Sequence, residues 1–274
     1  MRTLIGTFAV ILTLTLLPCS GHAQTISSHA DLDWTAPYRW VHIDNVDPKT
    51  YMAFESARKE WLKALTKDGK LLGDGRPLFW SSTAPDANTY FTFYPFKAWA
   101  DMDARNKMAV ETKRLVGDSA DKQYDSGDST LIPPHGSEIW RRVADADIVC
   151  EGTDSLTDMT AGVGRMDFRL VDWSNWKEFS TAYDTLQTIL KAEKYPLACR
   201  LYSNVYGGKQ GDYILFWMAK DEAALNGAPE MRAFLKEKIG SERAEKLVAA
   251  LEKYFPVQKT YHVVRRLDMS NLGQ

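Results

Sequence analysis

The sequence contains few cysteines and none of the short motifs that mark several common enzyme classes. Only three cysteines occur in 274 residues. There is no His-Glu-x-x-His, Gly-x-Ser-x-Gly, P-loop or Cys-x-x-Cys pattern. Zinc proteases with that helix, hydrolases with a nucleophile elbow, P-loop nucleotide hydrolases and thioredoxin-like redox proteins are therefore excluded. The acidic stretch DSGDS at residues 125–129 lacks the spaced glutamate of a calcium loop, so no metal site is predicted.

An excess of charge of one sign is also absent. Lys and Arg number 34 and Asp and Glu number 36, and they are interleaved without a basic stripe. Nucleic acid is therefore not an expected partner. Hydrophobic residues make up 45% of the chain and aromatic residues 12%, which is enough to form a substantial core.

Long hydrophobic runs are confined to the N-terminus. Arg2 is followed by an apolar run from Leu4 to Leu17, then by Pro18 and by small residues up to Ala23. This pattern predicts a secretory signal peptide with cleavage near Ala23, and hence a periplasmic or extracellular protein. A retained membrane anchor is the alternative, but the run is shorter than the roughly 20 residues that a spanning helix needs. A lipoprotein modified at Cys19 is a further alternative. Pro18, directly before this cysteine, fits the usual requirement for a small residue badly. No transmembrane segment is expected in the mature chain.

Two segments far apart in the chain share one pattern. Residues 47–65, DPKTYMAFESARKEWLKAL, align without a gap with residues 172–190, DWSNWKEFSTAYDTLQTIL. Each begins with an aspartate suited to capping and continues with apolar residues at helical spacing. Both segments are therefore predicted to be amphipathic helices.

The elements around these helices repeat as well. Asp47 and Asp172 lie 125 residues apart, and Arg141 and Arg265, each the first arginine of a matching Arg-Arg pair, lie 124 apart. An offset held across several elements indicates a tandem duplication. The predicted elements of the two halves are a strand (40–46 and 166–171), the helix above, two strands (77–96 and 198–219), a second helix (99–117 and 229–240) and a last strand (138–143 and 262–267).

The order of elements in each half predicts the fold. Strand, helix, strand, strand, helix, strand is the ferredoxin-like order, in which both helices cover one face of a four-stranded antiparallel sheet. The two bare faces would be buried against each other, which gives an α+β protein of two ferredoxin-like repeats packed as an α/β barrel. The predicted boundaries are a signal peptide at 1–23, an N-terminal extension at 24–37, a first repeat at 38–150, a linker at 151–163 and a second repeat at 164–270.

In this order of elements the chain resembles the dimeric α/β-barrel superfamily, in a single-chain tandem form. The resemblance covers about residues 38–268 and depends on element order, not on a catalytic motif. That superfamily includes haem-dependent enzymes, cofactor-free monooxygenases, polyketide cyclases and proteins without known chemistry. The resemblance therefore implies a fold and leaves the function open.

Strand alternation divides the side chains of each predicted sheet into two faces. We expect the more apolar set to lie under the helices and the more polar and aromatic set to point between the sheets. Buried charges in such an interior must either pair with one another or line a wet cavity. The predicted interior residues are His42, Asp44, Tyr90, Glu138, Arg142, Asp167, Arg169, Tyr213, Trp217, His262 and Arg266.

Three functions fit such an interior. The first is binding of a small anionic or aromatic ligand, since arginines suit carboxylates and phosphates and aromatic rings suit flat apolar surfaces. The second is a cofactor-independent or haem-dependent enzyme of the oxygenase type, with His42 or His262 as a general base or an axial haem ligand. The third is a scaffold whose interior charges are only salt bridges and whose surface binds a partner. No oligomeric state is predicted.

The resemblance also bears on the cysteines left after a signal peptide is removed. In tandem barrels of this type, the last strand of one half commonly lies beside the second strand of the other. That arrangement would bring Cys150 and Cys199 close enough for a disulfide, which an exported protein could form. Two free buried thiols are the alternative.

Overall fold

The computed structural model describes residues 35–67, 70–71, 78–83, 88–103, 107, 135–158 and 160–270. The predicted signal peptide, most of the N-terminal extension and most of the predicted helix at 99–117 lie outside these residues.

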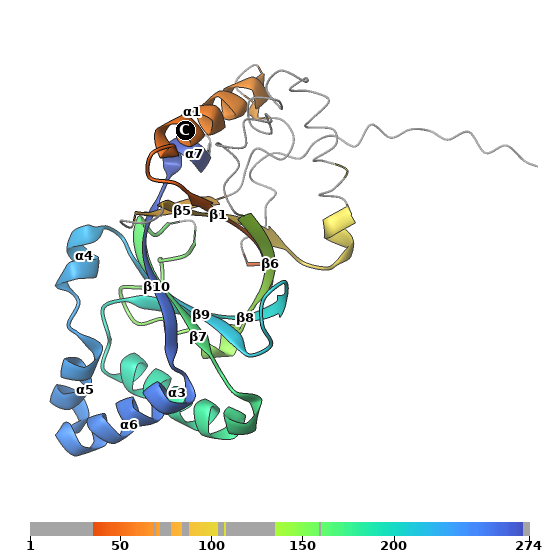
Figure 1. Cartoon of the computed structure of the whole chain (residues 1–274). Helices are drawn as coiled ribbons and strands as arrows, with labels where there is room; N and C mark the ends of the chain where they lie inside the picture. The colour runs from red at the N-terminus through yellow and green to blue at the C-terminus, as the bar shows by residue number, and fades with distance from the viewer. Residues whose placement is uncertain are drawn as a thin grey trace, which may run out of the picture.

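Eight antiparallel strands form a closed barrel (Figure 1). The first half contributes β1 (Tyr38–Val46), β4 (Leu78–Thr83), β5 (Asn88–Phe96) and β6 (His135–Arg142). The second half contributes β7 (Val163–Leu170), β8 (Ala198–Tyr206), β9 (Asp212–Ala219) and β10 (Val257–Arg265). A separate two-stranded sheet pairs β2 (Thr66–Lys67) with β3 (Lys70–Leu71).

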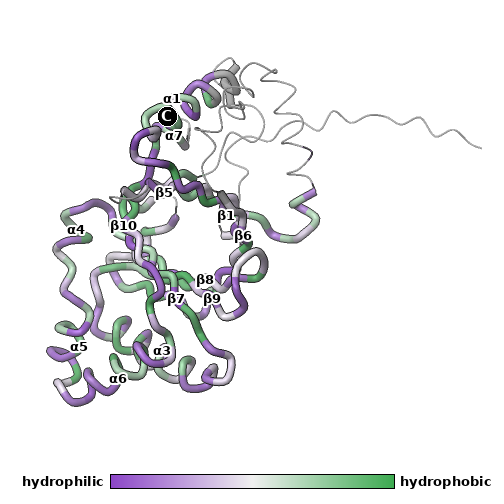
Figure 2. The backbone as a smooth tube through the Cα atoms, viewed as in Figure 1, coloured by the Kyte–Doolittle hydropathy of each residue, from purple (hydrophilic) through white to green (hydrophobic). Residues whose placement is uncertain are grey.

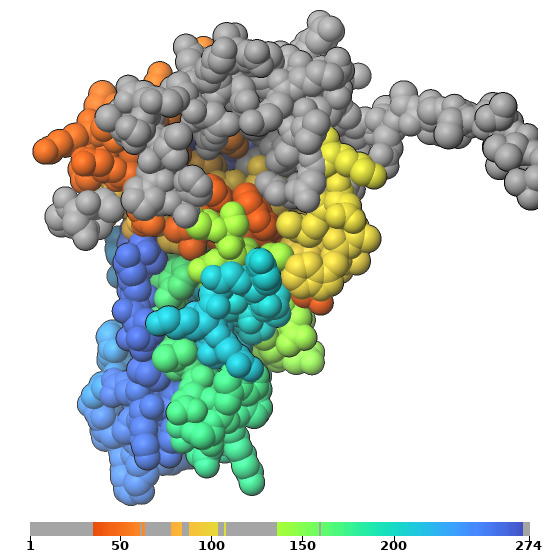
Figure 3. Space-filling model, turned by 45° about the vertical axis from the view of Figure 1, so that its right-hand side comes forward, coloured from red at the N-terminus to blue at the C-terminus, as the bar shows by residue number. Residues whose placement is uncertain are grey.

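The strand order is the same in both halves. Around the barrel it is β6-β1-β5-β4 for the first half and β10-β7-β9-β8 for the second. The last strand of each half pairs with the second strand of the other, β6 with β8 and β10 with β4. The β8–β9 hairpin, in cyan, consequently lies against the lime-green β6 segment in the space-filling view (Figure 3). The predicted α+β barrel of two ferredoxin-like sheets is confirmed.

Helices cover the barrel on two opposite sides (Figure 1). On the side of β1 and β5 lie α1 (Tyr51–Leu65) and α7 (Leu267–Ser270). Around the second-half sheet lie α3 (Trp176–Ala192), α4 (Glu222–Gly227), α5 (Met231–Ile239) and α6 (Ser241–Tyr254). Two 3-10 turns follow strands: η2 (Ala144–Ala146) leads from β6 into the linker, and η3 (Trp173–Asn175) leads from β7 into α3. No helix within the described ranges has the length and apolarity needed to cross a membrane.

The helix α3 forms where the sequence pattern predicts it. Asp172 accepts a hydrogen bond from the backbone N–H of Ser174 at 2.9 Å, which caps the 3-10 turn that leads into α3. The side chains that recur at intervals of three and four residues then face the sheet, as an amphipathic helix requires. The buried residues of α3 are Phe179, Ala182, Tyr183, Leu186 and Leu190.

The barrel interior is a packed apolar core. One hydrophobic cluster draws side chains from all eight strands, which only the interior of a closed barrel can bring together. Its members are Val41, Leu78, Trp80, Phe91, Phe93, Trp140, Ala161, Met166, Ala198, Tyr202, Ile214, Phe216, Met218 and Val263. A second cluster packs α3, α5 and α6 on the outer face of β8 and β9. Figure 2 shows hydrophobic residues recurring along the strands that enclose the barrel.

This arrangement reverses the predicted faces of β1, β5, β7, β9 and β10, whereas β6 keeps its predicted face. Residues expected under the helices, such as Met166 and Phe216, fill the interior. Because the side-chain period of a strand is two, the alternate residues move together to the other face. Closing two sheets into a barrel removes the interior from water on every side, so the most apolar set is buried there. The residues that lie on the outer side, contrary to the prediction, are His42, Asp44, Tyr90, Asp167, Arg169, Tyr213, Trp217 and His262.

The linker between the halves contributes a buried ion network to one end of the barrel. Asp158 accepts hydrogen bonds from Arg39 Nε at 3.0 Å and from the Tyr202 hydroxyl at 3.0 and 3.1 Å, and Arg200 Nε lies 3.5 Å away. Burial alone would raise the pKa of the Asp158 carboxyl, but the charges of Arg39 and Arg200 outweigh it and hold that pKa below its usual value. These charges therefore pair with one another, as in the salt-bridge alternative.

The two cysteines are free thiols, and both are buried. The strands pair as expected, but Ile148, not Cys150, lies opposite Cys199. The Cys150 thiol donates to the Leu190 carbonyl at 3.3 Å instead. The predicted disulfide is wrong for this structure, because the register places Cys150 two residues beyond the position that faces Cys199.

Candidate functional site

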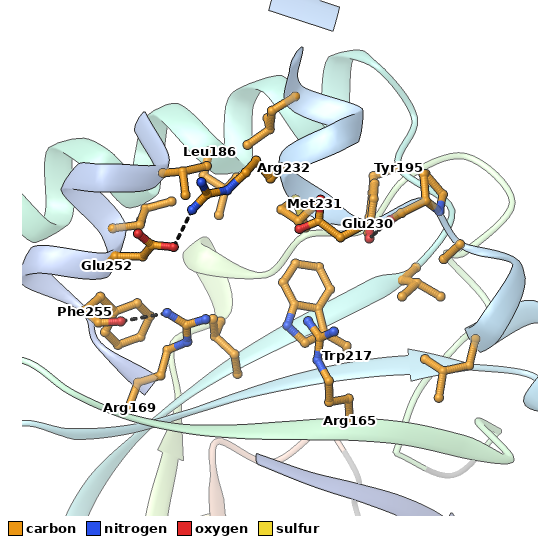
Figure 4. Close-up of a pocket in the computed structure, with 18 of the residues that line it drawn as sticks. Arg165, Arg169, Leu186, Tyr195, Trp217, Glu230, Met231, Arg232, Glu252 and Phe255 are labelled. Carbon is orange, nitrogen blue, oxygen red and sulfur yellow. Dashed lines mark hydrogen bonds and ion pairs between the residues drawn. The ribbon is translucent and has the colours of Figure 1, made fainter. Parts of the chain in front are cut away.

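A cavity of 510 Å³ lies between the second-half sheet and its helices (Figure 4). Residues of β7, β9 and β10 form its floor, and residues of α3, α5 and α6 form its walls. The volume lies within the range of about 300–1,000 Å³ that is usual for small-molecule sites. Much of the lining is apolar, including Leu186, Leu215, Trp217, Met231 and Leu235. The site is thus outside the barrel, whereas the sequence predicted it between the sheets.

Two arginines of β7 project into the floor of the cavity. Arg165 and Arg169 flank Asp167, because alternate residues of a strand share one face. An Asp167 oxygen lies 3.3 Å from Arg165 Nε and 3.9 Å from Arg169 Nη2, and the other accepts from Thr260 Oγ1 at 2.8 Å. One carboxylate therefore faces two guanidinium groups, which leaves the floor with an excess of positive charge.

Arg169 is the more buried of these two arginines. Its Nη1 donates to the Phe255 carbonyl at 2.6 Å, and its guanidinium carbon lies 5.1 Å from the centroid of the Phe255 ring. Burial lowers the pKa of Arg169, the positive charge of Arg165 lowers it further, and Asp167 acts against both. An anion entering the cavity would stabilise this partly desolvated cation.

Two buried N–H groups of the cavity residues have no acceptor within the described part of the chain. They are Nε1 of Trp217 and Nε of Arg169. Trp217 is 3% exposed, and its indole projects from the sheet into the cavity beside Arg165, at 5.8 Å from guanidinium carbon to ring centroid (Figure 4). Buried donors in folded proteins are normally paired. These two donors mark the place where acceptor atoms of a ligand would bind.

On the opposite side of the cavity, Arg232 is paired with carboxylates, and Glu230 accepts a hydrogen bond from the backbone N–H of Ala233 at 2.8 Å. Arg232 of α5 lies 2.7 Å from Glu252 of α6, as Figure 4 shows, and 3.2 Å from Glu245. Arg232 therefore joins α5 to α6. The excess of positive charge lies on the floor, where Arg165 and Arg169 share one carboxylate.

His262 is the one histidine of the described residues that lines the cavity. Its side chain is 51% exposed, and Nε2 lies 3.2 Å from a Glu222 oxygen. His42 lies outside the cavity, on the outer face of β1 in the other half. A haem needs an axial ligand inside its pocket, so His42 cannot serve one bound in this cavity. His262 lines the cavity, but it is half exposed and its Nε2 faces Glu222, which does not favour a buried axial ligand. No group of three or more potential metal ligands occurs among the residues that the structure describes.

Several predicted residues lie away from the cavity. Tyr90 and Arg266 both contact Glu55 of α1, at 2.8 Å from the Tyr90 hydroxyl and at 2.7 Å from Arg266 Nη2. Tyr213 packs in the outer core, with its ring centroid 5.7 Å from that of Phe179. These three residues therefore stabilise helix packing.

Glu138 and Arg142 alternate along β6 with residues of the outer face, so they lie on the interior side with Trp140. Glu138 accepts from Trp140 Nε1 at 2.8 Å, and Arg142 Nε donates to Asp147 at 2.8 Å. Burial raises the pKa of both carboxyls, and the hydrogen bonds oppose that rise. The predicted interior set is thus divided, and only Arg169, Trp217 and His262 of that set line the cavity.

Sequence reasoning misses four charged residues of the cavity, which are Arg165, Glu230, Arg232 and Glu252. Arg165 stands two residues before Asp167, as Arg169 stands two after it, so extending the alternation by one step would have found it. Arg232 and Glu252 lie on helices. The alternation of strands gives no information on which face of a helix turns inward.

Comparison with known proteins identifies the fold and nothing finer. No family model matches the chain, and no curated protein does. A candidate monooxygenase from Fusobacterium nucleatum superposes with a TM-score of 0.50 at 12% identity, covering 84% of this chain and 92% of that one. The chain has a two-repeat α/β-barrel fold.

Two further structures are similar at lower scores. A candidate monooxygenase from Lactobacillus acidophilus has a TM-score of 0.44 at 10% identity, covering 84% of this chain and 94% of that one. A mutant chlorite dismutase from Candidatus Nitrospira defluvii has a TM-score of 0.43 at 11% identity, covering 86% and 95%.

Proposed function

We propose that the chain is exported and that the cavity between its second-half sheet and helices binds a small anion with a flat apolar body. The observation that carries this proposal is a pair of buried donors, Trp217 Nε1 and Arg169 Nε, that find no acceptor among the described residues and lie beside a floor with excess positive charge. The anionic end of the ligand would bind Arg165 and Arg169. Its apolar body would lie against the Trp217 ring and the neighbouring leucines.

The chemistry of these groups favours an anion over a neutral ligand. A hydrogen bond to a charged group contributes about 1.5–3 kcal/mol, whereas a neutral one contributes about 1 kcal/mol. A guanidinium group presents donors in a planar arrangement that matches a carboxylate. A carboxylate placed on the floor would therefore satisfy buried donors and balance the charge at once.

A matched pair of probes tests this preference. We expect 1-naphthoate to bind at least about 10-fold more tightly than neutral 1-naphthamide in calorimetric titrations, because only the former is an anion. Arg169→Gln should remove that difference. Arg243→Gln removes the same charge from an exposed position of α6 and should leave it intact. Equal affinity for both probes, or equal effects of the two substitutions, would contradict the proposal.

An oxygenase-type reaction in the same cavity is the second candidate. The fold shared with a candidate monooxygenase supports it, and the cavity would hold an aromatic substrate in a water-poor site. Oxygen uptake in the presence of 1-naphthol, together with an absorption spectrum of the protein from its own host, tests this candidate. Oxygen uptake that depends on Trp217 would support an oxygenase-type reaction. If no uptake exceeds background, ligand binding remains as the function proposed for the cavity.

A further inference from the structure

A serine, a histidine and an aspartate lie in series on the outer face of the first-half sheet, each within about 3 Å of the next. His42 of β1 lies directly opposite Ser137 of β6 in the register of the two strands. Its Nδ1 is 2.9 Å from the Ser137 hydroxyl, and its Nε2 is 3.1 Å from an Asp44 oxygen. Asp44 shares the face of His42 because it lies two residues further along the same strand.

Exposure to solvent increases along the series from Asp44 through His42 to Ser137. Asp44 is buried, the His42 side chain is 24% exposed, and Ser137 is exposed. One Asp44 oxygen is buried and has no hydrogen-bond partner among the described residues. A buried carboxylate is thus directed at the imidazole, and the hydroxyl at the other end of the series is open to solvent.

The neighbours of the two ring nitrogens assign a role to each. A carboxylate only accepts, so Nε2 of His42 carries the hydrogen that Asp44 receives. In the neutral ring Nδ1 is then bare and accepts the hydrogen of the Ser137 hydroxyl. The Trp40 ring stacks on the imidazole, at 5.4 Å between centroids and 11° between planes, which holds the ring in place.

We propose that Ser137, His42 and Asp44 form a nucleophilic triad that transfers the acyl group of carboxylic esters to water. A nucleophile within hydrogen-bond reach of a base that a third group orients is the arrangement that this chemistry needs. The triad is separate from the second-half cavity and does not depend on the function proposed for it.

The reaction is balanced with water as the only co-reactant. Ser137 Oγ bonds to the ester carbonyl carbon while its proton moves to His42 Nδ1. The carbon–oxygen bond to the alcohol breaks, and the departing oxygen takes that proton. Water then attacks the acyl-serine, passes a proton through His42 to Ser137 Oγ, and releases the acid.

The experiment uses the purified full chain and an ethyl fluorophosphonate carrying a fluorophore, which reacts only with activated serines. We expect one adduct per chain, located at Ser137 by peptide mass spectrometry, and hydrolysis of 4-nitrophenyl acetate with an initial burst. Ser137→Ala should abolish both signals. His42→Gln and the nearly isosteric Asp44→Asn should slow labelling at least about 100-fold and 10-fold respectively.

Ser180 provides the matched control, since it is partly exposed and hydrogen-bonded to Asp184 without a histidine. Ser180→Ala should change neither signal. Failure of the folded wild-type protein to label at Ser137 would overturn the proposal without reference to any variant. Labelling of Ser137 that persists at the wild-type rate in both His42→Gln and Asp44→Asn would show mere exposure and would also overturn it.

Discussion

Arg39 shows how this fold accommodates a charge that no water reaches. Its side chain is 0% exposed and is held by Asp158. The burial of Arg39 would lower its pKa, but the opposite charge of Asp158 outweighs that effect and raises it. A buried pair of this kind contributes little net stability compared with a hydrophobic pair, but losing one partner is costly because the other stays buried and charged.

We therefore expect Arg39→Met to lower the free energy of unfolding by about 3–5 kcal/mol. The exposed Arg243→Gln should change it by less than about 0.5 kcal/mol. Urea unfolding followed by circular dichroism measures both. A loss below about 1 kcal/mol for Arg39→Met would mean that Asp158 is solvated and that the end of the barrel is open.

The cysteines give a second prediction at this scale. Burial raises the pKa of both thiols, and for Cys199 the charges of Asp147 and Asp167 raise it further. A thiolate is the reactive form, so both cysteines should resist iodoacetamide at pH 8 in the folded protein. Both should react after denaturation without a reductant. A denatured, non-reduced chain that takes up no label would show a disulfide and contradict the structure.

At the scale of elements, an ion cluster holds α1 to α7. Arg266, just after β10, bonds to Glu55 of α1 and to Asp268 of α7, and Lys59 of α1 lies 2.7 Å from Asp268. The hydrogen bonds from Arg266 lower the pKa of both carboxyls, and burial opposes this in each.

This cluster predicts a pH dependence. A carboxyl with a lowered pKa contributes stability above its unfolded pKa of about 4, and that stability is lost as the pH falls through the folded pKa. Arg266→Gln should therefore lower the free energy of unfolding at pH 7 by about 1–2 kcal/mol, since the group is partly solvated. The gap between variant and wild type should shrink as the pH falls below about 4. A gap that is the same at pH 7 and pH 3 would assign the loss to packing.

The elements themselves were largely predictable from the sequence. The helix at 172–190 and the strands of both halves follow from period and repeat, because helical and strand spacing are local properties. Which face of each strand points into the barrel was not predictable from the sequence. Alternation separates Met166 from Asp167 but does not say which of them points into the barrel, since both sides of these sheets are covered.

At the scale of the whole molecule, the two halves share one interior. The inner core takes side chains from every strand of the barrel, so neither half can bury its inner face alone. This explains why the polar set lies outside and why the cavity formed there, under the helices of the second half. The location of the cavity depends on how α3, α5 and α6 are spaced from the sheet, which is a packing property that no single segment of sequence encodes.

The central claim is that the ligand site lies between the second-half sheet and its helices. A crystal structure with 4-bromo-1-naphthoate, phased on the anomalous signal of bromine, tests it most directly. We predict a bromine peak inside the cavity, with the carboxylate in contact with Arg165 or Arg169 and the rings against Trp217. A peak within the barrel interior, or none in the cavity at a concentration that saturates binding in solution, would contradict this account.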